Sequence, residues 1–354
     1  MDELELLKKV NLDCAIKGKP LTKLKDILNK IDKDWLNDYY YVITKKQINE
    51  TKPKLINKIY NQLTNQSVIE SFLNNIKENE YNELVRIIEN NGEIQDDYID
   101  HKDYTYLKSF GIVYTFNYQD KLHIIIPEEI MNIFKNINIS DYHDKIIENT
   151  KLIDLAYSMV NLYGAGPLDL YLDYCHTYYD YDDSEKINLE CIIEPERTIS
   201  IKIIETLTNV YMIRDEIIDD EDKALIVKVI SDIEDDLYEF DFKPISLDEL
   251  LNYKELFYYE EIDSVIEFKE YLRDNDMDEE EIDLLIGAII LSFRRDYKEG
   301  ILTLSEILAD LNFEIDEDNY EEIMTHINNI INNIPIWGNK GGTNKEIILG
   351  NCYE

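Results

Sequence analysis

The stretch 71–137 changes its hydrophobic period partway along, and this constrains the fold more than any other feature of the chain. Apolar residues first recur at the spacing of a helix, which Asn91-Gly92 then ends. A second helical pattern starts at Asp96. Two β-rich runs follow, 112–116 and 122–126, with polar residues between them. The sequence therefore predicts helices followed by a β-hairpin.

Helices that lead into a two-stranded hairpin are typical of a winged-helix domain, and we expect that architecture here. A DNA-reading winged helix places its second helix in the major groove and needs basic or polar side chains on it. The expected second helix instead carries four aspartates against Lys102 and Lys108. The whole stretch has 6 Lys plus Arg and 12 Asp plus Glu. Phosphate contact would begin from repulsion, so we expect a protein-docking or structural domain.

Charge is divided unevenly along the 354 residues. Residues 1–66 hold 13 Lys and no Arg against 9 Asp plus Glu, a net charge of +4. Because the total is −39, the remaining 288 residues carry −43. Such asymmetry often separates a partner-binding arm from the body of a protein. We expect a protein partner with a basic surface, and nucleic acid only through residues 1–66, because an acidic body repels phosphate and anionic membranes.

Apolar runs and cysteines indicate the class of protein. The longest apolar run, Leu284 to Phe293, is too short to cross a membrane, and the first residues lack the apolar core of a signal peptide. The four cysteines, Cys14, Cys175, Cys191 and Cys352, stand far apart, which argues against a zinc site and a disulfide framework. We therefore expect a cytoplasmic protein without a metal or another cofactor.

The basic arm contains two expected amphipathic helices, at 21–31 and 53–63. Their sequences, LTKLKDILNKI and TKPKLINKIYNQL, resemble the two helices of the SAP or Rho-N-terminal-like module. The family's Gly is absent before the second helix, and the intervening segment is longer than usual. The resemblance implies nucleic-acid binding through five lysines, Lys45, Lys46, Lys52, Lys54 and Lys58. The alternative is that these lysines form an ordinary solvated surface.

From Asn149 onward, helical spacing of apolar residues predicts a mainly helical region. Further helices are expected over 199–218, 223–240, 279–296 and 319–334. The expected core stripes consist of Leu225, Val229, Ile233 and Leu237, and of Leu285, Ile289 and Phe293. The predicted fold class is mainly α: a multi-domain helical protein with a small winged-helix domain of helices and two strands. Its predicted parts are a SAP-like module at 1–66, the winged-helix-like domain at 67–148 and an acidic helical domain at 149–354.

The C-terminal segment NNIPIWGNKGGTNKEIILGN is similar to one that low-GC Gram-positive proteins with SEC-C motifs, and their relatives, often carry after a helical domain. The residues that stand on this pattern are Asn333, Trp337, Asn339, Gly341, Thr343 and Glu346. SAP-like and winged-helix-like segments often precede it in such proteins. The Cys-rich, zinc-chelating SEC-C motif itself is absent, so the resemblance implies no metal site here.

No catalytic signature is present in the sequence. The five histidines form no HxxxH or HExxH pair, and there is no G-x-S-x-G elbow or kinase motif. Cys175 and His176 are adjacent, so on a helix their side chains would point apart. Arg294-Arg295 is expected to close a helix C-terminus, or alternatively to hold a carboxylate or phosphate.

These observations favour a non-enzymatic binding or regulatory protein that acts mainly through protein–protein contacts, with weak non-specific nucleic-acid binding by its N-terminal arm. One alternative is an acidic nucleic-acid mimic that occupies the basic groove of a nuclease, polymerase or repressor, as phage-encoded inhibitors can. Another is an enzyme whose site is assembled from residues distant in the sequence.

Overall fold

The computed structural model describes residues 3–179, 201–205, 210–214, 241–255, 257–275, 277–295, 297–310 and 317–349. These residues are mainly helical with two small sheets, which confirms the expected mainly α class. They divide into two compact units, one ending at Ile153 and the other beginning at Asp154. No helix of the described ranges combines enough length and apolar character to span a bilayer.

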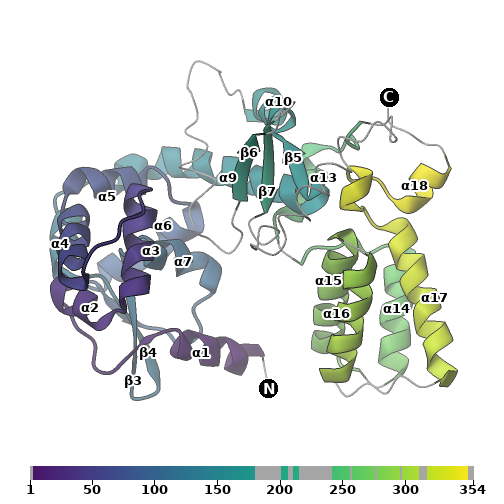
Figure 1. The fold of residues 1–354 in the computed structure, drawn as a ribbon, viewed down its shortest axis with the longest axis horizontal. Coiled ribbons are helices and arrows are strands. Elements are labelled where there is room, and N and C mark those ends of the chain that lie inside the picture. Colours follow the sequence, from purple (N-terminus) through teal and green to yellow (C-terminus); the bar gives the residue numbers. More distant parts are fainter. Residues whose placement is uncertain are drawn as a thin grey trace. The chain divides into compact units, whose positions relative to one another are not determined.

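The N-terminal unit joins helices to one four-stranded sheet (Figure 1). Its helices are α1 Glu3–Asp13, α2 Leu24–Lys30, α3 Lys33–Thr44, α4 Lys52–Leu63, α5 Gln66–Leu73, α6 Glu78–Glu89, α7 His101–Ser109, α8 Glu128–Phe134, the 3-10 helix η1 Ile139–Tyr142 and the start of α9 His143–Tyr163. Its strands are β1 Ile16–Lys17, β2 Glu93–Gln95, β3 Tyr114–Tyr118 and β4 Lys121–Ile125. The strand order is β1-β3-β4-β2, with β1 parallel to β3 and the other pairs antiparallel.

The expected β-hairpin is present as β3 and β4. Tyr118 pairs with Lys121, and the two residues between them, Gln119 and Asp120, have φ angles of 57° and 55°. Positive φ at both central residues is the mark of a type I′ turn, whose twist matches that of the flanking strands. The turn, rather than the apolar runs, thus sets the register of the hairpin.

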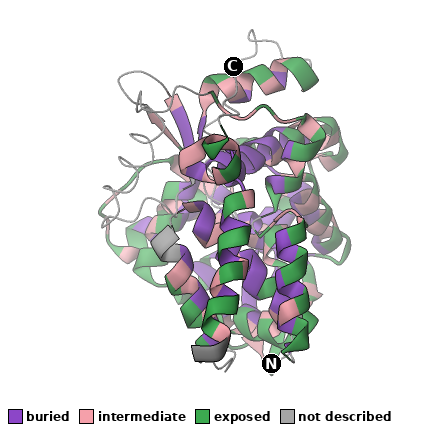
Figure 2. Cartoon of the chain, turned by 90° about the vertical axis from the view of Figure 1, so that its right-hand side faces the viewer, coloured by how far each residue is buried: buried purple, intermediate pink, exposed green. Residues whose placement is uncertain are grey.

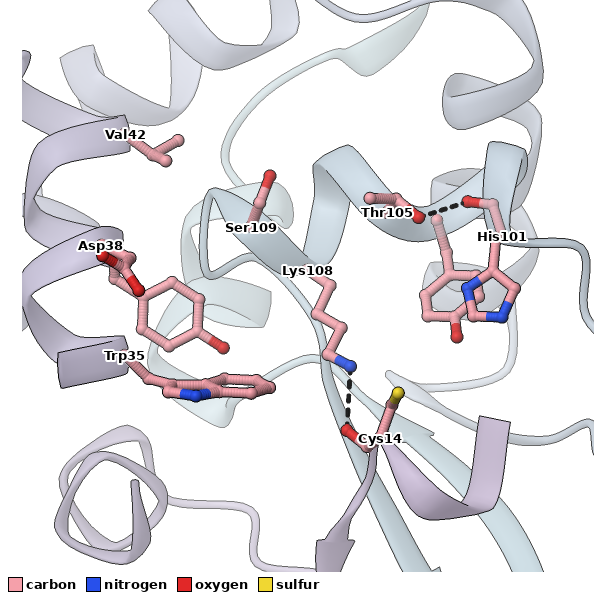
Figure 3. Close-up of a pocket in the computed structure, with 10 residues that line it drawn as sticks. Cys14, Trp35, Asp38, Val42, His101, Thr105, Lys108 and Ser109 are labelled. Carbon is pink, nitrogen blue, oxygen red and sulfur yellow. Dashed lines mark hydrogen bonds between the residues drawn. The ribbon is translucent and has the colours of Figure 1, made fainter. Parts of the chain in front are cut away.

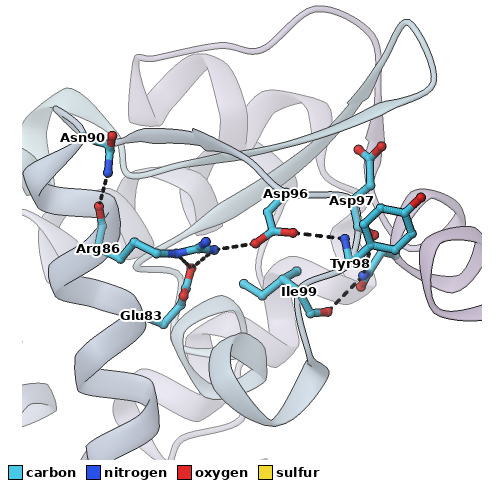
Figure 4. Close-up of polar contacts among 8 residues, drawn as sticks. Glu83, Arg86, Asn90, Asp96, Asp97, Tyr98 and Ile99 are labelled. Carbon is cyan, nitrogen blue, oxygen red and sulfur yellow. Dashed lines mark hydrogen bonds and ion pairs between the residues drawn. The ribbon is translucent and has the colours of Figure 1, made fainter. Parts of the chain in front are cut away.

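The helix expected to begin at Asp96 begins instead at His101, as α7. Asp100 caps it, because its carboxylate accepts a hydrogen bond from the Lys102 amide at 3.0 Å. Asp96 lies in the preceding turn, where it accepts hydrogen bonds from Arg86 at 2.7 Å and from the Tyr98 amide at 3.1 Å (Figure 4). Both aspartates therefore organise the backbone before α7 rather than sitting within the helix.

One hydrophobic cluster runs through the N-terminal unit, from Ala15 to Ile146. Helices α2 and α4 occupy the two predicted amphipathic segments, and the buried residues of α4 are Leu55, Ile56, Ile59 and Leu63. The longer segment between them folds as α3, which buries Leu36, Tyr39 and Val42. Side chains from 1–66 and from 67–148 both contribute to this cluster.

Helix α1 is held by polar contacts to the turn before α7. Asn11, which is only 1% exposed, donates from Nδ2 to the carbonyl oxygens of Asp97 at 3.2 Å and Ile99 at 3.0 Å. Its Oδ1 accepts a hydrogen bond from the Tyr104 hydroxyl at 2.7 Å. A buried amide that satisfies three partners fixes the position of one element against another, because leaving any partner unpaired is costly.

The carboxylate of Asp97 supplies the second attachment. It accepts a hydrogen bond from the Leu122 amide at 2.8 Å and pairs with Lys121 at 3.3 Å and Lys8 at 3.4 Å. Burial opposes the charged form, but these hydrogen bonds outweigh it and lower the pKa of Asp97. A carboxylate with a lowered pKa contributes stability above its unfolded pKa, and that contribution is lost as pH falls through the folded value.

We predict that Asn11→Ala destabilises the protein by about 3 kcal/mol, because it leaves buried hydrogen-bonding groups unpaired. Asn29→Ala is the matched control, since Asn29 is exposed and its side chain donates within its own helix, to the Lys25 carbonyl oxygen. The control should change the free energy of unfolding by less than about 0.5 kcal/mol. Urea denaturation measures both, and equal effects would contradict the structural role of Asn11.

The C-terminal unit contains a three-stranded sheet and a group of helices. Its strands are β5 Ala165–Pro167, β6 Ile201–Glu205 and β7 Val210–Arg214, in the antiparallel order β5-β7-β6. Its helices, besides the end of α9, are α10 Leu168–Tyr179, α13 Leu247–Leu251, η3 Asn252–Lys254, α14 Asp263–Asp274, α15 Glu279–Arg295, α16 Tyr297–Asp310, α17 Glu317–Asn333, η4 Trp337–Asn339 and α18 Asn344–Ile348.

The helix expected over 199–218 is wrong, because β6 and β7 occupy this segment. Ile201 of β6 is buried while Lys202 is exposed, as alternation in a strand requires. The segment is rich in β-branched Ile and Val, which favour strands over helices. Apolar residues at helical spacing were compatible with either structure in so short a run.

The predicted stripe of Leu285, Ile289 and Phe293 is confirmed, since all three are buried in one cluster between α14, α15, α16 and α17. Buried residues lie along one side of each helix and exposed residues along the other (Figure 2). The other predicted stripe, Leu225, Val229, Ile233 and Leu237, lies outside the described residues.

Candidate functional site

The predicted nucleic-acid-binding lysines lie on α4 and in the loop before it. Lys45 and Lys46 are exposed at the end of α3, and Lys45 Nζ lies 5.7 Å from the centre of the Tyr41 ring. Lys52 Nζ donates to the carbonyl oxygen of Asn29 at 3.1 Å. These three lysines belong to the N-terminal unit, and the contacts of Lys45 and Lys52 are local ones within it.

Glu50 holds the remaining two predicted lysines. Its carboxylate pairs with Lys58 at 3.1 Å and with Lys54 at 3.6 Å. The hydrogen bond from Lys58, followed by the charges of both lysines, lowers the pKa of Glu50. Two of the five charges counted from the sequence are therefore shared with one carboxylate, which reduces the attraction of this surface for phosphate.

If this surface binds nucleic acid, Glu50→Gln should strengthen binding, because it releases Lys54 and Lys58. Each additional phosphate contact steepens the dependence of log K on log salt by about 0.9 for duplex DNA. Glu89→Gln, at an exposed position on α6, removes the same charge elsewhere and serves as the control. Filter binding across a salt series measures both. Equal slopes for the two variants, or no binding at low salt, would contradict a nucleic-acid role for these lysines.

Trp337, from the predicted C-terminal pattern, is part of a core. It is 1% exposed, and its Nε1 donates to the Asn161 carbonyl oxygen at 3.0 Å. Gly164, just after α9, faces its ring with a φ of +73°, and a Cβ there would lie 2.4 Å from the indole. Gly164 therefore ends α9 with a close backbone approach to Trp337, and the short strand β5 follows it.

The other residues of this pattern make local structural contacts. Thr343 and Glu346 form a capping box for α18, with hydrogen bonds of 3.1 and 2.8 Å. Glu346 also pairs with Lys243 at 2.8 Å. The remaining contacts are the amide of Asn339 to Asn344 Oδ1 at 2.8 Å, the amide of Asn333 to the Asn329 carbonyl at 2.8 Å, and Gly341 at φ +81° beside Tyr163. In the described structure, these residues of the C-terminal segment make contacts that stabilise the local fold.

We predict that Gly164→Ala destabilises the chain by about 3 kcal/mol or more, because the new methyl group strikes a buried ring and the backbone is left-handed. Gly338→Ala is the control, since a Cβ there meets no heavy atom within 4 Å and should change stability by less than about 0.5 kcal/mol. Urea unfolding, followed by Trp337 fluorescence in a Trp35→Phe background, measures both. Similar midpoints would refute the packing role assigned to Gly164.

Cys175 and Arg294, which the sequence left open for catalysis or ligand binding, are both buried. Cys175 is completely buried, and burial raises the pKa of its thiol to about 11, so it stays protonated at neutral pH. Arg294, in the last turn of α15, is also buried and donates to Glu260 at 3.1 Å and to the Tyr258 carbonyl oxygen at 2.9 Å. Its guanidinium therefore holds a carboxylate of its own chain.

A pocket of about 320 Å³ lies between α3 and α7 in the N-terminal unit (Figure 3). Helix α3 contributes one wall and α7 the other, and the residue after α1 closes one end. The lining residues are Trp35, Asp38, Tyr39 and Val42 from α3, His101, Tyr104, Thr105, Lys108 and Ser109 from α7, and Cys14.

Lys108 is half-buried in this pocket, whereas Asp38, the other acidic or basic residue of the lining besides His101, is exposed. Its Nζ donates to the Cys14 carbonyl oxygen at 3.0 Å and lies 5.8 Å from the centre of the Trp35 ring. Among the described residues no carboxylate lies within ion-pair distance of this nitrogen. Burial lowers the pKa of Lys108, because the charged form loses water without gaining an opposite charge.

His101 and Trp35 complete the pocket. His101 stacks on Tyr104 with ring centres 5.6 Å apart, and its Nε2 is buried with no hydrogen-bond partner in the described part of the chain. Burial, followed by the nearby positive charge of Lys108, lowers the pKa of His101, so the ring is neutral at pH 7. Trp35 is 52% exposed, which is unusual for so large an apolar side chain. Apolar walls and two convergent polar groups are typical of a small-molecule site.

The sequence contained a partial signal for this pocket that the predictions did not use. Residues 35, 38, 39 and 42 follow helical spacing on α3, as do 101, 104, 105 and 108 on α7. Each set therefore lies on one helix face. Nothing in the spacing reveals that the two faces meet, because that depends on tertiary packing.

Comparison with known proteins adds no relative: no family model, no curated protein and no solved structure matches the chain. The SAP-like and SEC-C-related resemblances stay predictions.

Proposed function

We propose that this chain is a non-enzymatic binding protein whose N-terminal unit holds a small, largely apolar organic ligand between α3 and α7. The observation that carries the proposal is the pocket itself: about 320 Å³, aromatic on several sides, with the Lys108 amine and the His101 ring among its walls. Ligand pockets in proteins have volumes of about 300–1,000 Å³ and combine apolar walls with a few placed polar groups.

The unpaired polar groups favour a ligand that carries a hydrogen-bonding oxygen. His101 Nε2 has no partner among the described residues, and Lys108 Nζ has only the Cys14 carbonyl oxygen there. A lysine nitrogen can donate more than one hydrogen bond, so a ligand oxygen beside Lys108 Nζ would be favourable. Trp35, half exposed beside them, would gain apolar contact when the pocket fills.

The same packing supports a role for the winged-helix-like segment other than reading DNA. Helix α7 and the β3–β4 hairpin that follows it support the winged-helix-like interpretation. Among the nine residues of α7, however, only Lys102 is fully exposed, and α3 lies against the pocket face. A recognition helix needs several exposed side chains along one face. We infer that this helix serves the pocket.

Protein contacts would then transmit the state of the pocket. The net charge of −39 supports a partner with a basic surface, because complementary potentials speed association and disfavour acidic competitors. Binding to such a partner should weaken as salt is added.

We predict that cuminyl alcohol, a small aromatic alcohol of about eleven non-hydrogen atoms, binds saturably with a Kd on the order of 1 mM or tighter. It should change the fluorescence of half-exposed Trp35, whereas Trp337 is buried elsewhere. Thr105→Phe should abolish binding, because the added ring fills the pocket.

Thr44→Phe is the matched control for this prediction. Thr44 on α3 and Thr105 on α7 each donate to the carbonyl oxygen four residues earlier, at 2.6 Å, but only Thr105 lines the pocket. The control variant should bind like the unaltered chain. Loss of binding in both variants, or saturable binding in neither the variants nor the unaltered chain, would refute the proposed site.

A further inference from the structure

We propose that Lys108 captures the ligand covalently, by forming a reversible imine with a small aromatic aldehyde or ketone that enters the α3–α7 pocket. This inference rests on the proposed function, since it assigns the ligand class of the same pocket. The observations behind it are the amine's surroundings, its lack of a carboxylate partner among the described residues and the room beside it.

Lys108 differs from several other described lysines because it lines a pocket and has no carboxylate partner among the described residues. Lys8 pairs with Asp97 at 3.4 Å, Lys58 with Glu50 at 3.1 Å and Lys269 with Asp283 at 2.8 Å. A carboxylate partner stabilises the ammonium form and so reduces the fraction of free amine. Lys108 Nζ instead meets the Cys14 backbone carbonyl and the Trp35 ring, which stabilise the ammonium less than a carboxylate does.

The position of the amine suits attack on a bound carbonyl group. In Figure 3 the Lys108 side chain descends from α7 between Trp35 on one side and His101 on the other, toward Cys14. An aromatic ring bound against Trp35 would place a carbonyl substituent near the amine. Desolvation of a lysine in an apolar pocket is one of the recognised ways of making its nitrogen nucleophilic.

A neutral carbonyl compound fits these surroundings better than an organic anion. An anion would also gain from the amine, but Asp38 lies at the rim of the same pocket and is exposed. The net charge of −39 further lowers the local concentration of small anions. An aldehyde meets neither repulsion, and its carbonyl oxygen is a hydrogen-bond acceptor.

Imine formation needs no further reactant. The lone pair of the neutral amine attacks the carbonyl carbon and forms a C–N bond, while the π electrons of C=O move to oxygen, which takes a proton. The nitrogen then loses its hydrogens as protons, the oxygen leaves as water, and the C=N bond forms. One amine and one aldehyde give one imine and one water, with no change of oxidation state.

Reductive trapping tests this inference on the unaltered full-length chain. The protein is incubated at neutral pH with limiting cuminaldehyde and sodium cyanoborohydride, which reduces the imine to a stable amine. Peptide mapping by mass spectrometry then gives the extent of labelling at each lysine. We expect several-fold more adduct at Lys108 than at Lys102, which is exposed two turns away on the same helix and pairs with Asp100 at 3.4 Å.

Two comparisons complete the test. Excess cuminyl alcohol, which has no carbonyl group, should slow labelling of Lys108 but not of Lys102. Lys108→Met replaces the amine with an apolar side chain of similar length. It should sharply reduce the total amount of adduct, whereas Lys102→Met should leave that amount nearly unchanged. Because the mapping uses the unaltered chain, the result does not depend on whether the Lys108 variant folds.

The outcomes separate this inference from the function beneath it. Binding of cuminyl alcohol together with equal labelling of Lys108 and Lys102 would overturn covalent capture while leaving the pocket intact. Failure of the alcohol to bind would overturn both, and preferential labelling of Lys108 that the bound alcohol does not suppress would overturn covalent capture in this pocket. Preferential labelling of Lys108 that the alcohol suppresses would support both.

Discussion

The buried carboxylate of Asp97 is the interaction on which the N-terminal unit depends. It draws together Lys8 from α1 and Lys121 from β4, and it accepts a backbone amide from Leu122. Asn11 ties α1 to the same turn through its amide. Once α1 is fixed there, the next residue beyond it, Cys14, is placed to meet Lys108. Electrostatic contacts near the sheet thus set the geometry of a pocket formed by two other helices.

Much of the fold could be predicted because its signals are local. The stripe of Leu285, Ile289 and Phe293 follows helical period over a long segment, and its burial is confirmed. The hairpin follows from two β-rich runs around a polar turn. The segment 201–214 could not be assigned from period alone, because short apolar runs suit either structure and only sheet pairing decides. The meeting of the α3 and α7 faces is likewise a tertiary fact.

The number of charged residues in a segment did not predict which charges remain available on its surface. Counting residues made the segment before α7 acidic, yet Asp96 pairs with Arg86 and Asp97 with two lysines. The same holds for the basic arm, where Glu50 occupies Lys54 and Lys58. In both places, charged side chains that could have bound a partner instead form ion pairs within the chain. Lys108, by contrast, has no opposite charge among the described residues and lines the α3–α7 pocket.

The acceptor for the Lys108 amine within the described residues is a main-chain oxygen, not a side chain. A substitution at position 14 would change the thiol but keep the carbonyl, so sequence drift there should leave the amine's hydrogen bond in place. If the pocket is under selection, we therefore expect Lys108 on α7 and the backbone conformation just after α1 to be conserved. A side chain of similar size could replace the thiol at position 14, which lines the pocket, while the carbonyl oxygen keeps its hydrogen bond.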